Sequence, residues 1–177
     1  WRDLRAVGSA LVLPGRHEAE RRLPIEKMAR FISEHALEAI TAAVKDSEVR
    51  HRGEIRFAVE AALDLDELLR GVDARARAVE VFSRLRVWDT EENTGVLIYV
   101  QWIDRRVEIV ADRGIARQVP QAEWDRVCRH MEAAFRERRF GDGAVDAVRA
   151  VGDLLAGLFP AGGENPNELP DRPVLLT

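Results

Sequence analysis

The pattern of hydrophobic and polar positions is clearest between residues 95 and 112. Residues 95–102 begin with a glycine and are almost continuously apolar, which predicts a strand buried on both faces. Residues 107–112 instead alternate, with Val107, Ile109 and Ala111 on one face and Glu108, Val110 and Asp112 on the other. Because only residues 103–106 separate the two runs, we predict a hairpin that needs helices to cover it.

The remaining pattern predicts a third strand and several helices. Residues 54–60 place Ile55, Phe57 and Val59 on one face, which is typical of a strand with one polar side, nearer a sheet edge than residues 95–102. Helical spacing predicts helices over residues 33–47 and 73–87, over residues 120–135 after a first Pro120, and over residues 145–158 before Pro160. Residues 173–177 are expected to add a short edge strand.

The order of these elements predicts the fold class. A strand, helix and strand crossover of this length places residues 54–60 parallel to residues 95–102. We therefore expect an α/β fold, a three-layer α/β/α sandwich around a small mixed sheet with a central hairpin. Three segments are predicted: an N-terminal arm over residues 1–24, the α/β domain over residues 25–160 and a C-terminal tail over residues 161–177.

Composition and charge argue against some classes of partner and of site. The 177 residues carry 31 acidic and 27 basic side chains, a net charge of −4, which argues against nucleic acid as a partner because phosphate binding needs clustered positive charge. Cys128 is the single cysteine, so it forms no internal disulfide, and its place in an apolar helix stripe favours a core role.

Location and partners are predicted less directly. No apolar run approaches about 20 residues, and the chain begins without a signal-peptide pattern. We expect a cytoplasmic or membrane-associated protein with an unidentified protein partner. Residues 1–24, which are basic with an apolar patch, either touch a membrane surface peripherally or pack along the domain.

The strand directions also predict a candidate site. The starts of both parallel strands and the end of residues 107–112 lie at one edge of the sheet. Carboxylate and amide oxygens there suit Ca²⁺ or Mg²⁺, and no organic cofactor is expected. The candidate ligands are Glu54, Asp89, Glu92, Asn93 and Asp112.

Two alternatives remain for this edge. Loops that connect strands are normally polar, so the acids can simply be solvated. Arginines such as Arg86 and Arg113 can pair with the acids, or hold a phosphate or a partner's carboxylate.

Several motifs together resemble a known family. These are Gly53-Glu54-Ile55, Trp124, and the runs 93–100 (Asn-Thr-Gly-Val-Leu-Ile-Tyr-Val), 104–115, 159–160 (Phe-Pro) and 167–173 (Asn-Glu-Leu-Pro-Asp-Arg-Pro). Over residues 28–175 the chain resembles the TPM domain family, in its short, single-domain bacterial branch. Many members have Asp-Asn-Gly where this chain has Asn93-Thr94-Gly95.

The resemblance implies an α/β/α sandwich and a bacterial, membrane-associated setting. It also implies a heterogeneous set of functions, because some bacterial members bind Ca²⁺ and a plant thylakoid branch is linked to photosystem repair and acid phosphatase activity. We therefore expect a non-enzymatic binding or scaffold domain whose candidate ligand is a divalent cation, Ca²⁺ before Mg²⁺. The alternative is a metal-dependent acid phosphatase that uses the same acidic edge.

Overall fold

The computed structural model describes residues 32–61, 63, 69–163 and 165–176. The helices are α3 (Glu34–Glu48), α5 (Ala74–Arg84), α6 (Arg113–Ala116), α7 (Gln121–Arg136) and α8 (Phe140–Leu158), and the strands are β1 (Glu54–Glu60), β2 (Gly95–Gln101), β3 (Arg106–Ala111) and β4 (Val174–Leu176). The strands form one mixed sheet in the order β3-β2-β1-β4, with β3 antiparallel to β2 and with β2 and β4 parallel to β1. The predicted hairpin and the parallel crossover are both confirmed.

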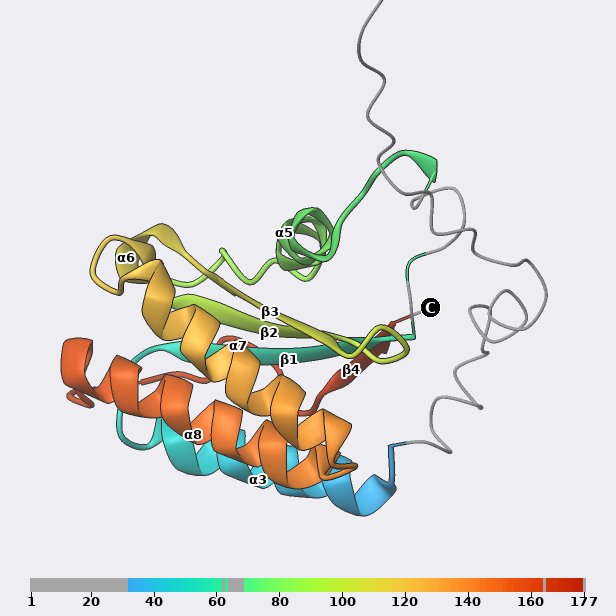
Figure 1. Ribbon diagram of the computed structural model, residues 1–177. Helices are drawn as coiled ribbons and strands as arrows, with labels where there is room; N and C mark the ends of the chain where they lie inside the picture. Colours follow the sequence, from blue (N-terminus) through green and yellow to red (C-terminus); the bar gives the residue numbers. More distant parts are fainter. Residues whose placement is uncertain (1–31, 62, 64–68, 164, 177) are drawn as a thin grey trace, which may run out of the picture.

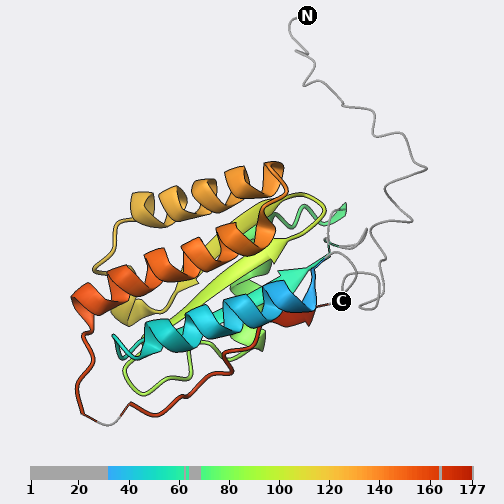
Figure 2. The same cartoon turned by 90° about the horizontal axis from the view of Figure 1, so that it is seen from below.

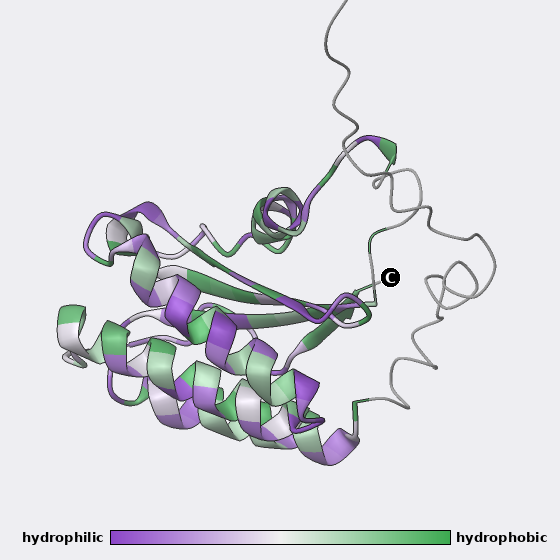
Figure 3. Ribbon diagram, in the orientation of Figure 1, coloured by the Kyte–Doolittle hydropathy of each residue, from purple (hydrophilic) through white to green (hydrophobic). Residues whose placement is uncertain are grey.

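The sheet lies between two unequal helical layers. Helices α3, α7 and α8 cover one face, and α5 lies across the other (Figure 1). Seen from below, the three helices run side by side under the strands (Figure 2). The strands are mostly hydrophobic, whereas hydrophobic and hydrophilic residues alternate along the helices (Figure 3). The predicted α/β/α sandwich is therefore confirmed.

The larger core lies under the three helices. Alternate residues of β1, Ile55, Phe57 and Val59, are fully buried there, together with Val96, Ile98 and Val100 of β2. Burial of each large apolar side chain stabilises the fold by roughly 1.5–3 kcal/mol. Alternate residues of a strand point to the same side of the sheet, so the apolar residues at every second position of β1 and β2 all face this core.

Helices α3 and α8 approach closely at Gly152. A Cβ atom at Gly152 would lie 1.8 Å from the hydroxyl oxygen of Ser47, so only glycine fits without a shift. That hydroxyl in turn lies 2.9 Å from Nε2 of His51, in the turn between α3 and β1. The close approach therefore fixes the chain where it enters the sheet.

Two helix boundaries differ from the prediction. The helix predicted to reach Val87 ends at Arg84, because the chain turns at Arg86, where φ is 55°. Helix α8 begins at Phe140 rather than at Val145, although Gly141 and Gly143 suggested a turn. A Cβ at Gly143 would lie 2.6 Å from that of Ala134, so this glycine serves helix packing.

Strand β1 has one polar side, as predicted, but that side is buried, and the prediction that β1 lies nearer a sheet edge than β2 was wrong, because β2 and β4 flank it. All seven of its residues are buried. The side chain of Arg56 donates to the carbonyl oxygens of Pro170 and Arg172, and Glu60 pairs with Arg77 of α5. Polar partners from distant segments thus replace the water that the alternation suggested.

The C-terminal residues return to the sheet. The edge strand predicted within residues 173–177 is confirmed as β4, where Val174 pairs with Ala58 and Leu176 with Glu60. In the described part of the chain, no helix has the length and apolar character needed to cross a bilayer. Residues 1–24, the predicted membrane-contacting arm, lie outside the described residues.

Candidate functional site

The predicted edge exists as a backbone arrangement. Glu54 pairs with Gly95 where β1 and β2 begin, and Val96 pairs with Ala111 where β3 ends. The amide of Asp112 donates to the carbonyl oxygen of Gly95 over 2.9 Å. The start of two parallel strands and the end of the antiparallel strand therefore meet, as the strand directions predicted.

Asp112 is the residue of this edge whose side chain lacks a hydrogen-bond donor for one of its oxygens. It precedes the short helix α6, and its Oδ1 accepts the amide hydrogen of Arg113 over 2.7 Å. Only 5% of Asp112 is exposed. Among the side chains that the structure describes, Asp112 Oδ2 is the one buried polar atom without a hydrogen-bond partner. Burying an unsatisfied acceptor costs about 1–3 kcal/mol, and more when it is charged.

Two carbonyl oxygens gather around Gly114, which lies two residues after Asp112 in the chain. The amide of Gly114 donates to the carbonyl oxygen of Asn93 over 3.2 Å. A Cβ atom at Gly114 would lie 2.6 Å from that oxygen and 3.1 Å from the carbonyl oxygen of Glu92. Glycine therefore keeps open a small, oxygen-lined space that any other residue would fill.

The conformation of the preceding loop places these oxygens. Asn93 has a φ of 55°, a left-handed conformation that asparagine tolerates better than most residues. The side chain of Thr90 accepts the amide hydrogen of Thr94 over 3.0 Å and fixes the loop. A hollow of about 510 Å³ opens here, lined by Glu92, Asn93, Arg113, Gly114, Arg117 and Gln118.

The five predicted ligands do not all converge on this hollow. The exposed carboxylate of Asp89 pairs with Arg86 over 2.6 Å, and Glu92 pairs with Arg52. Glu54 is buried, and its Oε2 accepts the amide hydrogen of Leu169 over 3.1 Å. In the described ranges, no group of three or more His, Cys, Asp or Glu side chains is arranged to hold a metal ion. Glu92 and Asn93 are thus brought together around Gly114, and Asp112 precedes Gly114 by two residues without lining the hollow, whereas Asp89 and Glu54 are engaged elsewhere.

A second group of acids was missed by the sequence reasoning. Glu48 at the end of α3, Glu54 at the start of β1 and Asp171 line a hollow of about 540 Å³ with Lys45 and the side chains of two asparagines, Asn165 and Asn167. Burial, with Glu54 and Asp171 nearby, raises the pKa of Glu48 to about 8. Burial also raises the pKa of Glu54 to about 7, with a further contribution from Glu168.

The sequence does contain one signal for this group. The run Asn167-Glu168-Leu169-Pro170-Asp171 carries polar side chains around a leucine in a segment otherwise predicted as a tail. Leu169 is buried, and so is Asp171 two residues later. A buried apolar residue within a polar tail is therefore the clue that locates the segment.

Two residues with nucleophile or base chemistry are engaged structurally. Burial raises the pKa of the Cys128 thiol to about 12 and keeps it protonated. His51 is fully buried, and its Nδ1 lies 2.9 Å from the carbonyl oxygen of Gly53. Burial lowers the pKa of His51 to about 4, so its ring is neutral at pH 7. Both residues thus have the properties of packed core groups.

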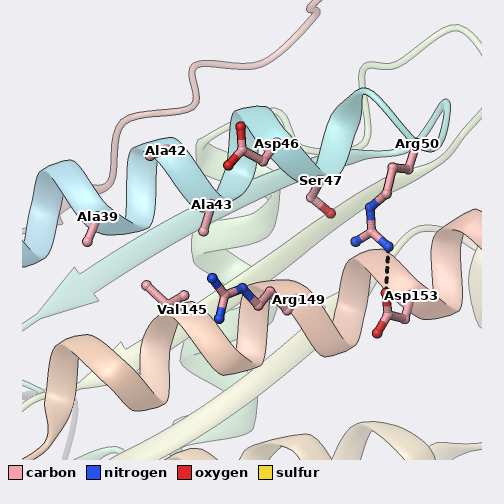
Figure 4. Close-up of a pocket in the computed structure, with 9 residues that line it drawn as sticks. All are labelled: Ala39, Ala42, Ala43, Asp46, Ser47, Arg50, Val145, Arg149 and Asp153. Atoms are coloured by element: carbon pink, nitrogen blue, oxygen red, sulfur yellow. Dashed lines mark hydrogen bonds and ion pairs between the residues drawn. The ribbon is translucent and has the colours of Figure 1, made fainter.

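A further hollow of about 590 Å³ lies between α3 and α8. Its floor is formed largely by alanines of α3 and by Val145, and Arg50 crosses the gap to Asp153 over 2.7 Å (Figure 4). Arg149 also points into the gap from α8 (Figure 4). Because charges of both signs line the rim, the groove favours neither anions nor cations.

Comparison with known proteins identifies the family. The model of the TPM domain matches residues 25–154. The structure resembles the solution structure of the BA42 protein from the psychrophilic bacterium Bizionia argentinensis, with a TM-score of 0.72 and 31% identity over 85% of this chain and 99% of that one. No curated protein matches the chain.

Two more distant structures share the fold. The N-terminal domain of a protein from P. gingivalis has a TM-score of 0.61 and 17% identity over 77% of this chain and 85% of that chain. The N-terminal domain of the cg2496 protein from Corynebacterium glutamicum has a TM-score of 0.54 and 16% identity over 75% and 78%. At these identities they support the architecture alone. The family match covers most of the chain, and the chain therefore belongs to the TPM domain family.

Proposed function

We propose that this TPM domain is a non-enzymatic binding domain whose ligand is a divalent cation, with Ca²⁺ preferred over Mg²⁺. The ligands would be Asp112 Oδ2, the carbonyl oxygens of Glu92 and Asn93, and the carboxylate of Glu92. The single observation that supports this most is the buried Oδ2 of Asp112, which lacks a donor. A cation would satisfy that oxygen directly.

The donor set suits calcium chemistry. Ca²⁺ accepts six to eight oxygen ligands in flexible geometry and uses carbonyl oxygens and water readily, whereas Mg²⁺ requires a nearly ideal octahedron. Glu92 is partly exposed, so it is able to exchange its partner Arg52 for a cation. Arg113 and Arg117 line the same hollow and oppose a cation, so we expect weak binding, with a Kd of roughly 10⁻⁴–10⁻³ M.

Two residues of the predicted ligand set are left out of this proposal. The carboxylate of Glu54 is buried against the amide of Leu169, and Asp89 is paired with Arg86 at the surface. Asp89 therefore provides an internal control, because it is an acid of the same edge that the proposal does not use.

Isothermal titration calorimetry with CaCl₂ and MgCl₂ tests the proposal. We expect binding heat for the unmodified chain, at least about tenfold weaker binding for Asp112→Asn, and unchanged binding for Asp89→Asn. Asparagine keeps the cap of α6, because its side-chain oxygen still accepts the amide hydrogen of Arg113. A chain that gives no heat and no thermal shift with either cation would overturn the proposal.

The alternative function, a metal-dependent acid phosphatase, predicts a different result. Hydrolysis of p-nitrophenyl phosphate would depend on added metal and would be lost in Asp112→Asn. Neither Cys128 nor His51 supports a nucleophilic mechanism, because the raised pKa of the half-buried Cys128 keeps its thiol protonated and His51 is buried and hydrogen-bonded. The membrane-adjacent setting and the contact through residues 1–24 stay predictions, which co-sedimentation with vesicles would test.

A further inference from the structure

The segment between α8 and β4 is held against the domain by polar contacts. We name residues 161–163 and 165–173 the C-terminal strap. After α8 the strap runs back past the end of α3 and the start of β1, and it ends in β4 (Figure 2). The three residues of β4 then pair with Ala58–Glu60 and cover the edge of β1. The strap therefore controls access to this edge of the sheet.

Side chains of the domain and of the strap form its anchors. Asn165 donates to the carbonyl oxygens of Glu48 and His51 over 3.3 and 3.2 Å. Arg56 donates to the carbonyl oxygen of Pro170 over 2.8 Å. Leu169 and Pro173 are the buried apolar residues of the described strap. With so little apolar burial, the strap depends on its polar contacts to remain closed.

A pair of carboxyl groups lies at the centre of these contacts. The side chains of Glu48 and of Asp171, which belongs to the strap, line the same hollow, and hydrogen bonding to Asp171 contributes to the raised pKa of Glu48. Asp171 is about nine-tenths buried and also accepts a hydrogen bond from Asn167 over 2.7 Å. Two carboxyl groups can bond to each other only when one of them carries a proton, because two carboxylates offer acceptors alone.

The surrounding charges do not compensate for loss of that proton. Acids outnumber bases among the neighbouring groups, which are Lys45 and Glu48 on α3, Glu54 and Arg56 on β1, and Glu168 and Asp171 on the strap. Lys45 is exposed and lies 4.0 Å from Asp171, and Arg56 already donates to carbonyl oxygens of the strap. Ionisation of the pair would therefore place like charges together in a partly buried space.

We propose that the C-terminal strap is a proton-dependent latch. A proton on the carboxyl group of Glu48, which faces Asp171 of the strap, keeps the strap and β4 on the domain, and loss of that proton releases them. Release exposes the backbone donors and acceptors of β1 at Ala58–Glu60, an unpaired edge to which another extended segment is able to add.

The direction of the pH effect follows from linkage. In the closed state burial raises the pKa of Glu48 to about 8, whereas a released, solvated glutamate has a pKa near 4.5. The contribution of this proton to closure is complete below pH 4.5 and is lost as the pH rises through 8. Between these limits the closing equilibrium falls by about tenfold per pH unit for each proton released.

Hydrogen exchange of the full chain between pH 6 and pH 9 tests the latch. Protection factors, corrected for the intrinsic pH dependence of exchange, are measured for the strap and β4, with α7 as an internal reference for global unfolding. We expect protection of the amide of Leu169 and of β4 to fall by about tenfold or more relative to α7. Equal protection at both pH values would overturn the proposal.

Variants separate the latch from general effects. Glu48→Gln donates to Asp171 without a titratable proton, so the strap should stay closed and the pH dependence should shrink to the part contributed by Glu54, whose pKa is about 7. Asp171→Asn leaves Glu48 titratable but removes the acid beside it, so the pH dependence should weaken, and this variant serves where Glu48→Gln fails to fold. The matched control is Glu38→Gln on the exposed side of α3, which should retain the dependence of the unmodified chain. A pH dependence unchanged in both latch variants would exclude a role for the proton on Glu48.

Discussion

Strand β1 presents Ile55, Phe57 and Val59 to the layer of α3, α7 and α8, whereas on its other side it presents Arg56 and Glu60. Under the three helices, apolar side chains fill the space. Under α5, a buried polar network joins the helix to the sheet. The fold is therefore stabilised differently on the two faces, by apolar packing on one and by a smaller apolar cluster together with matched polar partners on the other.

The polar network is centred on Glu60. Arg77 donates to both of its carboxylate oxygens, over 2.6 and 3.0 Å, and the hydroxyl of Tyr99 donates to Oε2. Gln101 donates to that hydroxyl over 3.3 Å. Burial, with the nearby Glu60, raises the pKa of Tyr99, so the hydroxyl stays protonated and keeps its role as a donor. Each group of the network thus depends on another one, unlike the aliphatic side chains on the opposite face.

Removing the arginine should have the largest effect. In Arg77→Met the carboxylate of Glu60 remains buried without its bidentate partner, and we expect the free energy of unfolding to fall by about 3–5 kcal/mol. Urea denaturation measures the loss. Arg84→Met, on the exposed side of the same helix, is the control and should change stability by no more than about 0.5 kcal/mol.

The double variant Arg77→Met with Glu60→Met would test whether the cost comes from the unpaired charge. It should recover part of the loss, because no charged group of the pair then remains buried. If Arg77→Met were no more destabilised than Arg84→Met, the two faces would not differ in the proposed way.

The contrast between the faces also explains what the sequence could predict. Alternation identified Ile55, Phe57 and Val59 as core residues, and the crossover identified the parallel pair, because both signals are local. The partners of Arg56 lie more than 110 residues away in the strap, so the strand pattern alone suggested a solvent-exposed side. Hydrophobic periodicity and strand propensity predict a sheet face that is stabilised by apolar burial. They do not predict a face that is stabilised by particular polar partners from distant segments.

The candidate site was predicted to a similar extent. Strand directions placed the backbones of Glu54, Gly95 and Asp112 at one edge. They could not indicate that Asp112 Oδ2 lacks a partner, which depends on side-chain rotamers and burial. Helix α6 was not predicted, because four residues are too short to show a helical period.

The three-helix face contains a polar contact of its own at His51, which predicts an effect of acid. Burial lowers the pKa of His51 to about 4, below the 6.5 expected in the unfolded chain. As the pH falls from 6.5 to 4, the unfolded chain takes up the proton first, and the stability that the neutral ring contributes is lost. A depression of this size corresponds to about 3 kcal/mol.

Denaturation of the unmodified chain and of His51→Gln at several pH values between 4 and 7 measures this effect. The raised pKa of Glu48 acts in the opposite direction, because its contribution is lost as the pH rises from 4.5 through 8. Since Glu48 is present in both proteins, the difference between their slopes isolates His51. The control is His130→Gln, at an exposed histidine. If stability depended on pH equally in His51→Gln and in His130→Gln, the prediction would be contradicted.

The smallest expected effect concerns local opening of the helices on the two faces of the sheet, after loss of their N-terminal caps. Ser33 caps α3 by accepting the amide hydrogen of Ala36 over 3.1 Å, and Asp73 caps α5 by accepting that of Ala76 over 2.7 Å. Replacing either cap with alanine should destabilise the capped helix by about 1 kcal/mol.

The location of that cost should differ between the two caps. Helix α3 packs against α8, whereas α5 is the one described helix on its face, so loss of the Asp73 cap should let α5 open separately. We expect exchange of α5 amides to accelerate about fivefold in Asp73→Ala, with α7 and α8 unaffected. In Ser33→Ala the α3 amides should change only together with global unfolding, and Asp73→Asn should retain the cap. If both alanine variants instead accelerated exchange only through global unfolding, α5 would be coupled to the sheet as tightly as α3 is to α8. The polar network would then hold α5 in place as firmly as an apolar core holds α3.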